Sequence, residues 1–364
     1  SVFLLGFDTI ALQAEKNLWS LSEWVKQNNT LNLYLQSNPT AKIAENFMSS
    51  VPPDGVSPEV WIEWKNRINQ YFKEFGRTAY EFDFAYSTPQ ETLTPTFESI
   101  KTFVEGKVES PFLRQSKFEK HRKQAEEEIL QHIGSSRKKL FLKLLHWAQE
   151  TAPMRENAIY LMGMGHPLIR RMFHEISARL IRGGATSHID DIYWLTKLEL
   201  EKLIIQLDEN IPLSDRRKSI LERKAELKKY QGYVPPAQLP EKKVKSISHA
   251  PQKQKDGKTV LRGIGTSSGV VTARACVLNN PADFKNFQPG SVLVAVTTTP
   301  AWTPLFASAS GIVTDIGGPL SHSSIVAREC GIPAVMATHT ATRSIKNGQM
   351  ITVDGSEGTV TIDE

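Results

Sequence analysis

Apolar positions in the first 233 residues follow the period of a helix. Hydrophobic side chains recur every three or four residues within Trp19–Val25 and again between Phe118 and Trp147, with charged residues between them. A stripe of aromatic residues has the same spacing and consists of Trp61, Trp64, Tyr71, Phe72 and Phe75. It forms either part of the helical core or the wall of an apolar binding pocket. We therefore predict a mainly α-helical domain over residues 1–233.

The segment HPLIRRMFHEISARLIRGG, residues 166–184, predicts an amphipathic helix that ends at the two glycines. Its apolar face is expected to consist of Ile169, Met172, Phe173, Ile176 and Leu180. The arginines at 170, 171, 179 and 182 lie largely off this face. They form either a solvated helix surface or the lining of a groove for an anionic substrate.

Two further features of the helical region concern caps and metals. Thr196 is expected to cap a helix that begins at Lys197, with Glu199 completing a capping box. His166 and His174 lie eight residues apart with no acidic ligand arranged around them. We expect both along one helix and predict no metal site in this chain.

The composition changes at residues 234–257. The stretch YVPPAQLPEKKVKSISHAPQKQKDGKT holds four prolines, many lysines and almost no large apolar residue. It is either a partly extended linker, which could span roughly 70 Å at about 3.1 Å per residue, or a surface loop packed along the protein. We predict a linker between two domains here.

Residues 258–364 carry the pattern of short strands separated by glycine turns. Six β-branched runs are expected to be strands: VVTARACVL, SVLVAVTTT, GIVTDI, PAVMAT, QMITVDG and GTVTID. Two helical windows lie among them, around Trp302–Ser310 and Ser323–Glu329. The fold class predicted for the whole chain is a mainly α-helical domain followed by a small, β-rich α/β domain.

The composition indicates which partners and which cellular location to expect, but it does not indicate the reaction. The net charge of +5 is small beside 44 basic and 39 acidic residues, so we expect neither a nucleic-acid nor a membrane partner. Two cysteines in 364 residues form no disulfide framework and favour a reducing, cytoplasmic location. The chain starts without an initiator methionine, and we expect it to belong to a longer protein.

The candidate chemistry lies in the stretch GGPLSHSSIVARECG, where His322 stands between a glycine loop and a short helix. Gly317 and Gly318 allow the backbone to turn tightly and to approach a ligand closely. A helix start attracts anions, and Ser321, Ser323 and Ser324 add hydroxyl donors. A neutral imidazole beside an anion site can accept a phosphoryl group on nitrogen. The alternative is an ordinary polar histidine on the surface.

The longer stretch GIVTDIGGPLSHSSIVARECGIPAVMAT resembles the phosphohistidine swivelling domain of phosphoenolpyruvate-utilising enzymes. The similarity extends over nearly all of residues 260–362, from LRGIGTSSGVVTARACVL to VDGSEGTVTI. The resemblance implies that His322 is the phosphorylated residue. It also makes Asp315 and Arg328 candidate supporting residues, Arg328 as a structural or a phosphate-facing group.

Two features favour one branch of that family. Leu320-Ser321 stands where the pyruvate-handling members usually have Thr-Cys, and the helical region precedes the histidine domain, with no phosphoenolpyruvate-binding barrel after it. This order resembles rifampicin phosphotransferase and its relatives, in which an ATP-grasp domain, a helical acceptor-binding domain and the histidine domain follow one another.

The helical region resembles that branch more locally. RINQYFKEFGRTAYEFDFAYSTPQE is similar to a family stretch, although Arg77-Thr78 replaces its His-Arg pair, and MRENAIYLMGMG begins a second such stretch. The acceptor-binding candidates that the resemblance implies are Glu81, Asp83, Arg155 and Glu156. Ion pairs and helix caps in a bundle are the alternative explanation for them.

The resemblance implies an ATP-dependent dikinase-type phosphotransferase. A separate ATP-grasp domain or subunit, outside this chain, would bind ATP and Mg²⁺ and phosphorylate His322. The small domain would then deliver the phosphoryl group to a small-molecule acceptor on the helical domain. Two alternatives stay open: an ATP-driven condensing enzyme that uses the same phosphohistidine, and a non-catalytic phosphocarrier or regulatory subunit.

Overall fold

The computed structural model describes residues 2–49, 51–77, 83–106, 108–230, 252–253, 259–279, 281–299 and 302–363. The chain forms two compact units: the first comprises residues 1–80, 88–164 and 248–364, and the second comprises residues 81–87 and 165–247. The second unit is thus inserted, along the sequence, between the two halves of the first. Most of the expected linker lies outside the described residues, and the predicted domain boundaries stay a prediction.

The first unit begins with a helical bundle. Its elements are η1 (Val2–Leu4), α1 (Ile10–Lys26), α2 (Asn29–Ser37), α3 (Thr40–Met48), α4 (Pro58–Phe75), α5 (Thr94–Val104), α6 (Pro111–His132) and α7 (Ser135–Gly163). The side chain of Ser57 accepts a hydrogen bond from the Val60 amide and so caps α4, which starts at Pro58. The whole aromatic stripe of α4 is buried, with Trp61 and Trp64 at most 1% exposed, so it is core.

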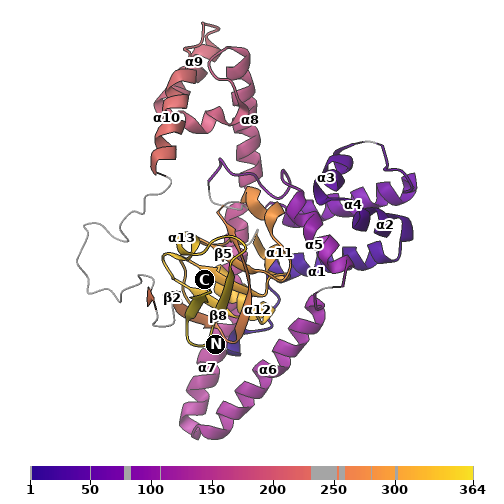
Figure 1. Cartoon of the computed structure of the whole chain (residues 1–364), viewed down its shortest axis with the longest axis vertical. Coiled ribbons are helices and arrows are strands. Elements are labelled where there is room, and N and C mark those ends of the chain that lie inside the picture. Colours follow the sequence, from indigo (N-terminus) through magenta and orange to yellow (C-terminus); the bar gives the residue numbers. More distant parts are fainter. Residues whose placement is uncertain are drawn as a thin grey trace, which may run out of the picture. The chain divides into compact units, whose positions relative to one another are not determined.

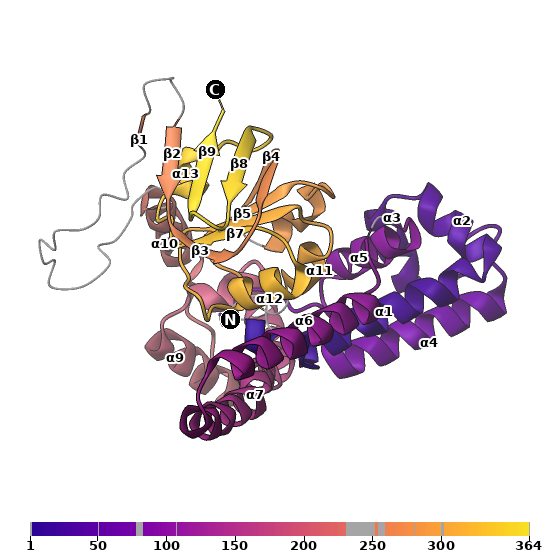
Figure 2. The ribbon, with the colours of Figure 1, turned by 90° about the horizontal axis from the view of Figure 1, so that it is seen from below.

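Helices α6 and α7 form a long hairpin (Figures 1 and 2). The chain turns between them at Ile133–Gly134, so the periodic pattern from Phe118 to Trp147 belongs to two helices. At the start of α6, Arg114 Nη2 lies 2.5 Å from Glu15 Oε2 of α1, and both side chains are buried. This ion pair fixes the base of the hairpin to the bundle.

The other half of the first unit, residues 259–363, is termed the C-terminal domain here. The short strand β1 (Gln252–Lys253), which precedes this domain in the chain, pairs with the edge of its sheet. The other strands of the sheet are β2 (Thr259–Arg262), β3 (Ile264–Ser267), β4 (Val270–Leu278), β5 (Val292–Ala295), β6 (Gly311–Thr314), β7 (Ala334–Met336), β8 (Met350–Asp354) and β9 (Thr359–Ile362). The spatial order is β1-β2-β9-β8-β4-β5-β6-β7-β3, and β4 to β7 are parallel. Each of the six predicted strands is present.

The central strands β5, β6 and β7 are buried at every position because both faces of the sheet are covered. On one face, Leu293 and Ile312 pack against the short helix α11 (Thr303–Phe306) and against α12 (His322–Cys330). On the other face, Val294 and Val313 pack against α13 (Ala341–Ser344) and strand β8. The predicted fold class, a helical region followed by a small α/β domain, is confirmed.

The second unit contains α8 (His166–Arg182), η2 (Ile189–Trp194), α9 (Lys197–Asp208) and α10 (Arg217–Tyr230). Helix α8 ends at the predicted glycine pair, with Gly184 at φ +78°. Among the described residues of the whole chain, no helix combines the length and apolarity needed to cross a membrane.

The buried face of α8 differs from the predicted one. His166 and Arg170 are buried, at 5% and 4% exposure, whereas Met172 is 58% exposed. Arg170 donates a hydrogen bond to the carbonyl oxygen of Phe84, and the Phe84 ring lies 4.6 Å from the His166 ring. Periodicity could not show this, because the partner segment lies some eighty residues earlier in the chain.

The histidines of α8 also have an acidic neighbour that the sequence did not indicate. His174 Nε2 lies 3.9 Å from Asp190 Oδ1 of η2. Asp190 Oδ2 in turn lies 3.6 Å from His188 Nδ1. Asp190 thus stands near two imidazoles, each of which is charged only when protonated, and the absence of a metal site stays a prediction.

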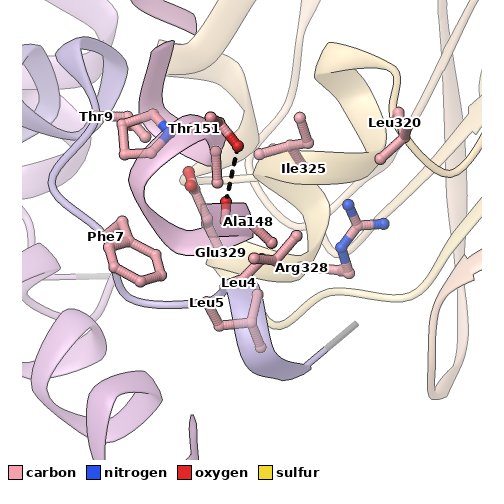
Figure 3. Close-up of a pocket in the computed structure, with 12 residues that line it drawn as sticks. Leu4, Leu5, Phe7, Thr9, Ala148, Thr151, Leu320, Ile325, Arg328 and Glu329 are labelled. Carbon is pink, nitrogen blue, oxygen red and sulfur yellow. Dashed lines mark hydrogen bonds between the residues drawn. The ribbon is translucent and has the colours of Figure 1, made fainter. Parts of the chain in front are cut away.

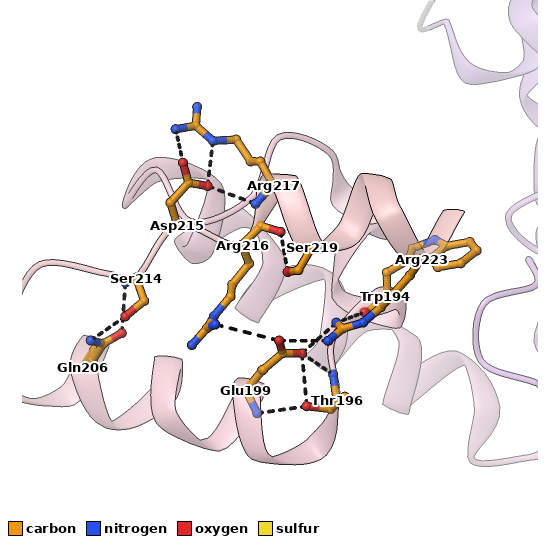
Figure 4. A network of polar contacts seen from close by, with 10 residues as sticks. All are labelled: Trp194, Thr196, Glu199, Gln206, Ser214, Asp215, Arg216, Arg217, Ser219 and Arg223. Atoms are coloured by element: carbon orange, nitrogen blue, oxygen red, sulfur yellow. Dashed lines mark hydrogen bonds and ion pairs between the residues drawn. The ribbon is translucent and has the colours of Figure 1, made fainter. Parts of the chain in front are cut away.

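The start of α9 carries a network of charges around Glu199 (Figure 4). The predicted capping box is confirmed: Thr196 Oγ1 accepts from the Glu199 amide, and Glu199 Oε2 accepts from the Thr196 amide at 2.8 Å. Arg223 of α10 then binds both carboxylate oxygens, at 2.7 and 2.9 Å. These hydrogen bonds from Arg223 lower the pKa of Glu199 to about 2.

Substituting Glu199→Gln tests the charge in this network, because glutamine can keep the cap but not the ion pair. We expect the variant to lose about 1 kcal/mol of stability at pH 7, since solvent screens the pair. A carboxyl with a lowered pKa stabilises the fold above its unfolded pKa near 4.3. The difference between the two proteins should therefore disappear as the pH falls from about 5 to 2.

Thermal unfolding followed by circular dichroism at several pH values measures this effect. Glu201→Gln is the matched control, because Glu201 lies on the same helix and contacts only Lys197, at 3.7 Å, among its described ion pairs. Equal losses in both variants, or a difference that persists at pH 2, would contradict the assignment.

Candidate functional site

His322 lies at the carboxyl end of the parallel strands. Strand β6 ends at Thr314, residues 315–321 form a loop, and α12 begins at His322 before the chain returns as β7. The loop runs beside the one that follows β5, since the Ile316 amide donates to the Val296 carbonyl at 2.9 Å. In open α/β sheets, ligands bind at this edge, where strand ends and helix starts meet.

The loop before His322 is held by glycine and by serine hydroxyls. Gly317 has φ +150°, and a Cβ built there would lie 3.2 Å from Ser321 Oγ and 3.3 Å from Thr314 Oγ1. Ser324 Oγ donates to the Gly318 carbonyl at 2.7 Å and lies 3.0 Å from Ser321 Oγ. The hydroxyls thus fasten the loop to the first turn of α12.

Two of the predicted phosphate-loop residues play smaller parts in this geometry. A Cβ on Gly318 would meet no atom within 4 Å, so the fold does not require glycine at that position. Ser323 Oγ lies 3.5 Å from Ser321 Oγ, at the limit of a hydrogen bond. Both residues nevertheless lie at the start of the helix, next to the imidazole.

His322 is the first residue of α12 and is only 5% exposed, so it is not an ordinary surface histidine. The ring of Phe306 stands edge-on to the imidazole, with centroids 5.9 Å apart. Phe306 belongs to α11, which also contacts α5 and α1 of the helical bundle. Phe306, a residue of the same domain, therefore shields the imidazole from solvent, and the bundle packs against the helix that carries Phe306.

Asp315 and Arg328 both stabilise the surroundings of the loop. Asp315 is buried and accepts hydrogen bonds from Thr338 Oγ1 at 3.1 Å and from the Thr342 amide at 3.3 Å. Arg328 donates to the carbonyl oxygens of Thr266 at 3.1 Å and Pro319 at 2.9 Å. Both roles expected for Arg328, the structural and the phosphate-facing one, stay predictions.

Comparisons with known proteins find a match in the C-terminal domain and another in the helical bundle. Residues 287–358 match the family described as PEP-utilising enzyme, mobile domain, and residues 4–156 match the rifampicin phosphotransferase fourth domain. The chain belongs to the PEP-utilising enzyme family. Within that family it carries a mobile domain and a region that matches the fourth domain of rifampicin phosphotransferase, and the resemblance seen in the sequence is confirmed.

Three curated relatives illustrate the similarity. An uncharacterised phosphotransferase, YvkC, of Bacillus subtilis is 27% identical over 99% of this chain and 43% of its own length. Rifampicin phosphotransferase of Bacillus subtilis is 30% identical over 82% of this chain and 34% of its own. Chondramide synthase of Chondromyces crocatus is 26% identical over 99% of this chain and 10% of its own. The chain spans less than half of each relative.

The predicted acceptor-binding residues are distributed over both units. Asp83 belongs to the second unit, where its Oδ1 accepts from the Ala85 amide at 2.9 Å in a turn. Glu81 lies outside the described residues. Arg155 and Glu156 lie in α7 of the first unit, and their side chains are outside the described part. Acceptor binding by these four residues stays a prediction.

Sequence reasoning missed the contact between the bundle and the carboxyl end of α12. Phe118 of α6 lies against Gly331, 3.6 Å from the position of a Cβ there. Burial raises the pKa of the Cys330 thiol to about 12, with the Arg114 guanidinium opposing and Glu15 adding to the shift. No local signal marks these residues, because their partners lie about two hundred positions away.

The pair of glycines before the histidine provides a test of the loop. Gly317→Ala should lower stability by about 1–3 kcal/mol, because alanine disfavours the positive φ and would press on two hydroxyls. Gly318→Ala, the matched control, should be nearly neutral. Thermal unfolding of both variants measures the difference. Equal effects at the two positions would show that the described loop conformation is wrong.

Proposed function

We propose that this chain is the phosphoryl-carrying and acceptor-binding part of an ATP-dependent, dikinase-type phosphotransferase. The observation that carries the proposal is the position of His322 as the first residue of α12, at the carboxyl edge of the parallel strands. Membership of the PEP-utilising family supports it, as does similarity to phosphotransferases over most of the chain. The whole protein's activity is therefore a proposal that rests on one imidazole.

In the first step, His322 accepts a phosphoryl group from ATP. A ring nitrogen forms a bond to the β-phosphorus as the bridge between the α- and β-phosphates breaks and AMP leaves. One water molecule cleaves the bridge between the β- and γ-phosphates and releases inorganic phosphate. The positive end of α12 and the neighbouring amides stabilise the anionic group that results. ATP and Mg²⁺ are assigned to an ATP-grasp domain or subunit beyond this chain. Within the described residues, no group of three or more metal-binding side chains is placed to hold a metal ion.

In the second step, the phosphoryl group passes to a hydroxyl of a small-molecule acceptor on the helical domain. The nitrogen–phosphorus bond breaks while the new oxygen–phosphorus bond forms, and the hydroxyl proton leaves to solvent. Phosphoryl transfer depends mainly on positioning and electrostatic stabilisation. One histidine can therefore serve two distant sites if its domain moves between them.

The test uses the full-length protein that contains this chain, incubated with ATP labelled at the β- or the γ-phosphate. We expect acid-labile label from β-labelled ATP, no label in His322→Asn, and normal labelling in His339→Asn. His339 is an exposed histidine of the same domain at φ +62°, a conformation that asparagine tolerates. Label that survives in His322→Asn, or label that comes only from the γ-phosphate, would falsify the proposal.

A second candidate function is condensation, in which the phosphoryl group activates one substrate for joining to another. The specific observation in its favour is the similarity of 99% of this chain to a stretch of chondramide synthase. Both candidates require phosphorylated His322 but differ in their products. Mass spectrometry of the reaction should find a phosphorylated acceptor if the first is right, and a joined product with free phosphate if the second is.

A further inference from the structure

A cavity of about 260 Å³ lies beside α12 (Figure 3). Three segments line it: Leu4–Thr9 next to η1, Ala148–Pro153 of α7, and Leu320–Glu329 around α12. The first two belong to the helical bundle and the third belongs to the C-terminal domain. The cavity is therefore complete only while α12 is docked against the bundle.

The lining is apolar in character because its polar groups are already engaged. Thr151 Oγ1 donates to the Trp147 carbonyl at 2.9 Å, and Thr9 Oγ1 accepts from the Leu12 amide at 3.3 Å. Arg328 is bound to two carbonyl oxygens of its own domain, and the negative charge of Glu329 interacts with the Arg114 guanidinium. What the walls present to a ligand is mainly the side chains of Leu4, Leu5, Phe7, Leu320 and Ile325.

Size and lining together define the class of ligand. An apolar cavity of roughly 150 Å³ accepts benzene. One of about 260 Å³ has room for two fused rings. Since the engaged polar groups offer no partner for a buried charge, the ligand should be uncharged. The chemistry fits a small, neutral aromatic molecule.

The cavity also lies close to the reactive residue. Ile325 follows His322 by three positions in α12, and Glu329 follows Ile325 by four, so these side chains share one face of the helix. The cavity thus begins one helical turn from the imidazole. Nearby, the buried Glu15–Arg114 pair and Phe118 meet Cys330 and Gly331 at the other end of α12.

We propose that this cavity is a regulatory site: a small, neutral aromatic molecule binds in it and holds α12 docked, with His322 buried. The inhibitory consequence, but not the binding, rests on the proposed function of a moving phosphohistidine domain. A ligand that binds only the docked form shifts the equilibrium by its differential affinity. At one hundred times its dissociation constant, it raises the ratio of docked to undocked protein about 100-fold.

Cys330 reports on docking without any need for ATP. A thiol reacts as its thiolate, so the raised pKa of Cys330 makes modification slow while α12 is docked. In a Cys276→Ser background, the rate of reaction with a disulfide reagent at pH 8 measures how often α12 leaves the bundle. Indole serves as the probe ligand, and saturating indole should lower this rate at least 5-fold.

A filled cavity should abolish the effect of indole. Ala148→Phe places a ring in the cavity and should itself slow the modification of Cys330, leaving no response to indole. Ala158→Phe, at an exposed position of the same helix, is the matched control and should respond as the parent does. Circular dichroism checks folding, and Ala152→Leu replaces Ala148→Phe if that variant does not fold.

Three results would overturn the inference. Indole could leave the rate of Cys330 modification unchanged in the parent protein. It could slow the reaction equally in the filled variant, which would place its binding elsewhere. Cys330 could also react as fast as an unfolded thiol, so that no docked form is populated. Each result can occur while His322 is phosphorylated normally, so a failure here is distinct from a failure of the proposed function.

Discussion

The chain must pass from the buried strand β6 into helix α12 within seven residues, and the position of His322 depends on this turn. Gly317 supplies the positive φ that the turn requires, and Asp315 anchors its start to the segment after β7. Arg328, two turns into α12, donates a hydrogen bond to the carbonyl oxygen of Pro319. Loop geometry and hydrogen bonds therefore place the backbone of His322, and the imidazole itself packs against Phe306.

The same arrangement links the histidine to the bundle. Phe306 touches the imidazole, and its helix, α11, contacts α5 and α1, so one aromatic residue of the C-terminal domain connects the histidine to the bundle. At the far end of α12, the buried Glu15–Arg114 pair lies beside Cys330. A buried ion pair contributes little net stability, but losing one partner is costly, so this pair favours one specific packing of α6 on α1 beside the end of α12.

The strands and helices of the C-terminal domain could be predicted because their signals are local. Alternating β-branched residues gave β4 to β9, and the glycine pair followed by His322 gave the start of α12. The same approach was wrong for α8, where Arg170 is buried against the carbonyl of Phe84. It also could not find the electrostatic interaction of Arg114 with Cys330. Both failures concern partners that are distant in sequence, where no pattern within one segment carries information.

The insertion of the second unit between the halves of the first has a consequence for folding. The contacts of α11 with α5 and α1 join residues that are about two hundred or more positions apart in the chain. Such contacts close a long loop, and the conformational entropy of closing it is lost before the contacts form. We therefore expect the helical bundle and the C-terminal domain each to form its own core before the two halves pack together.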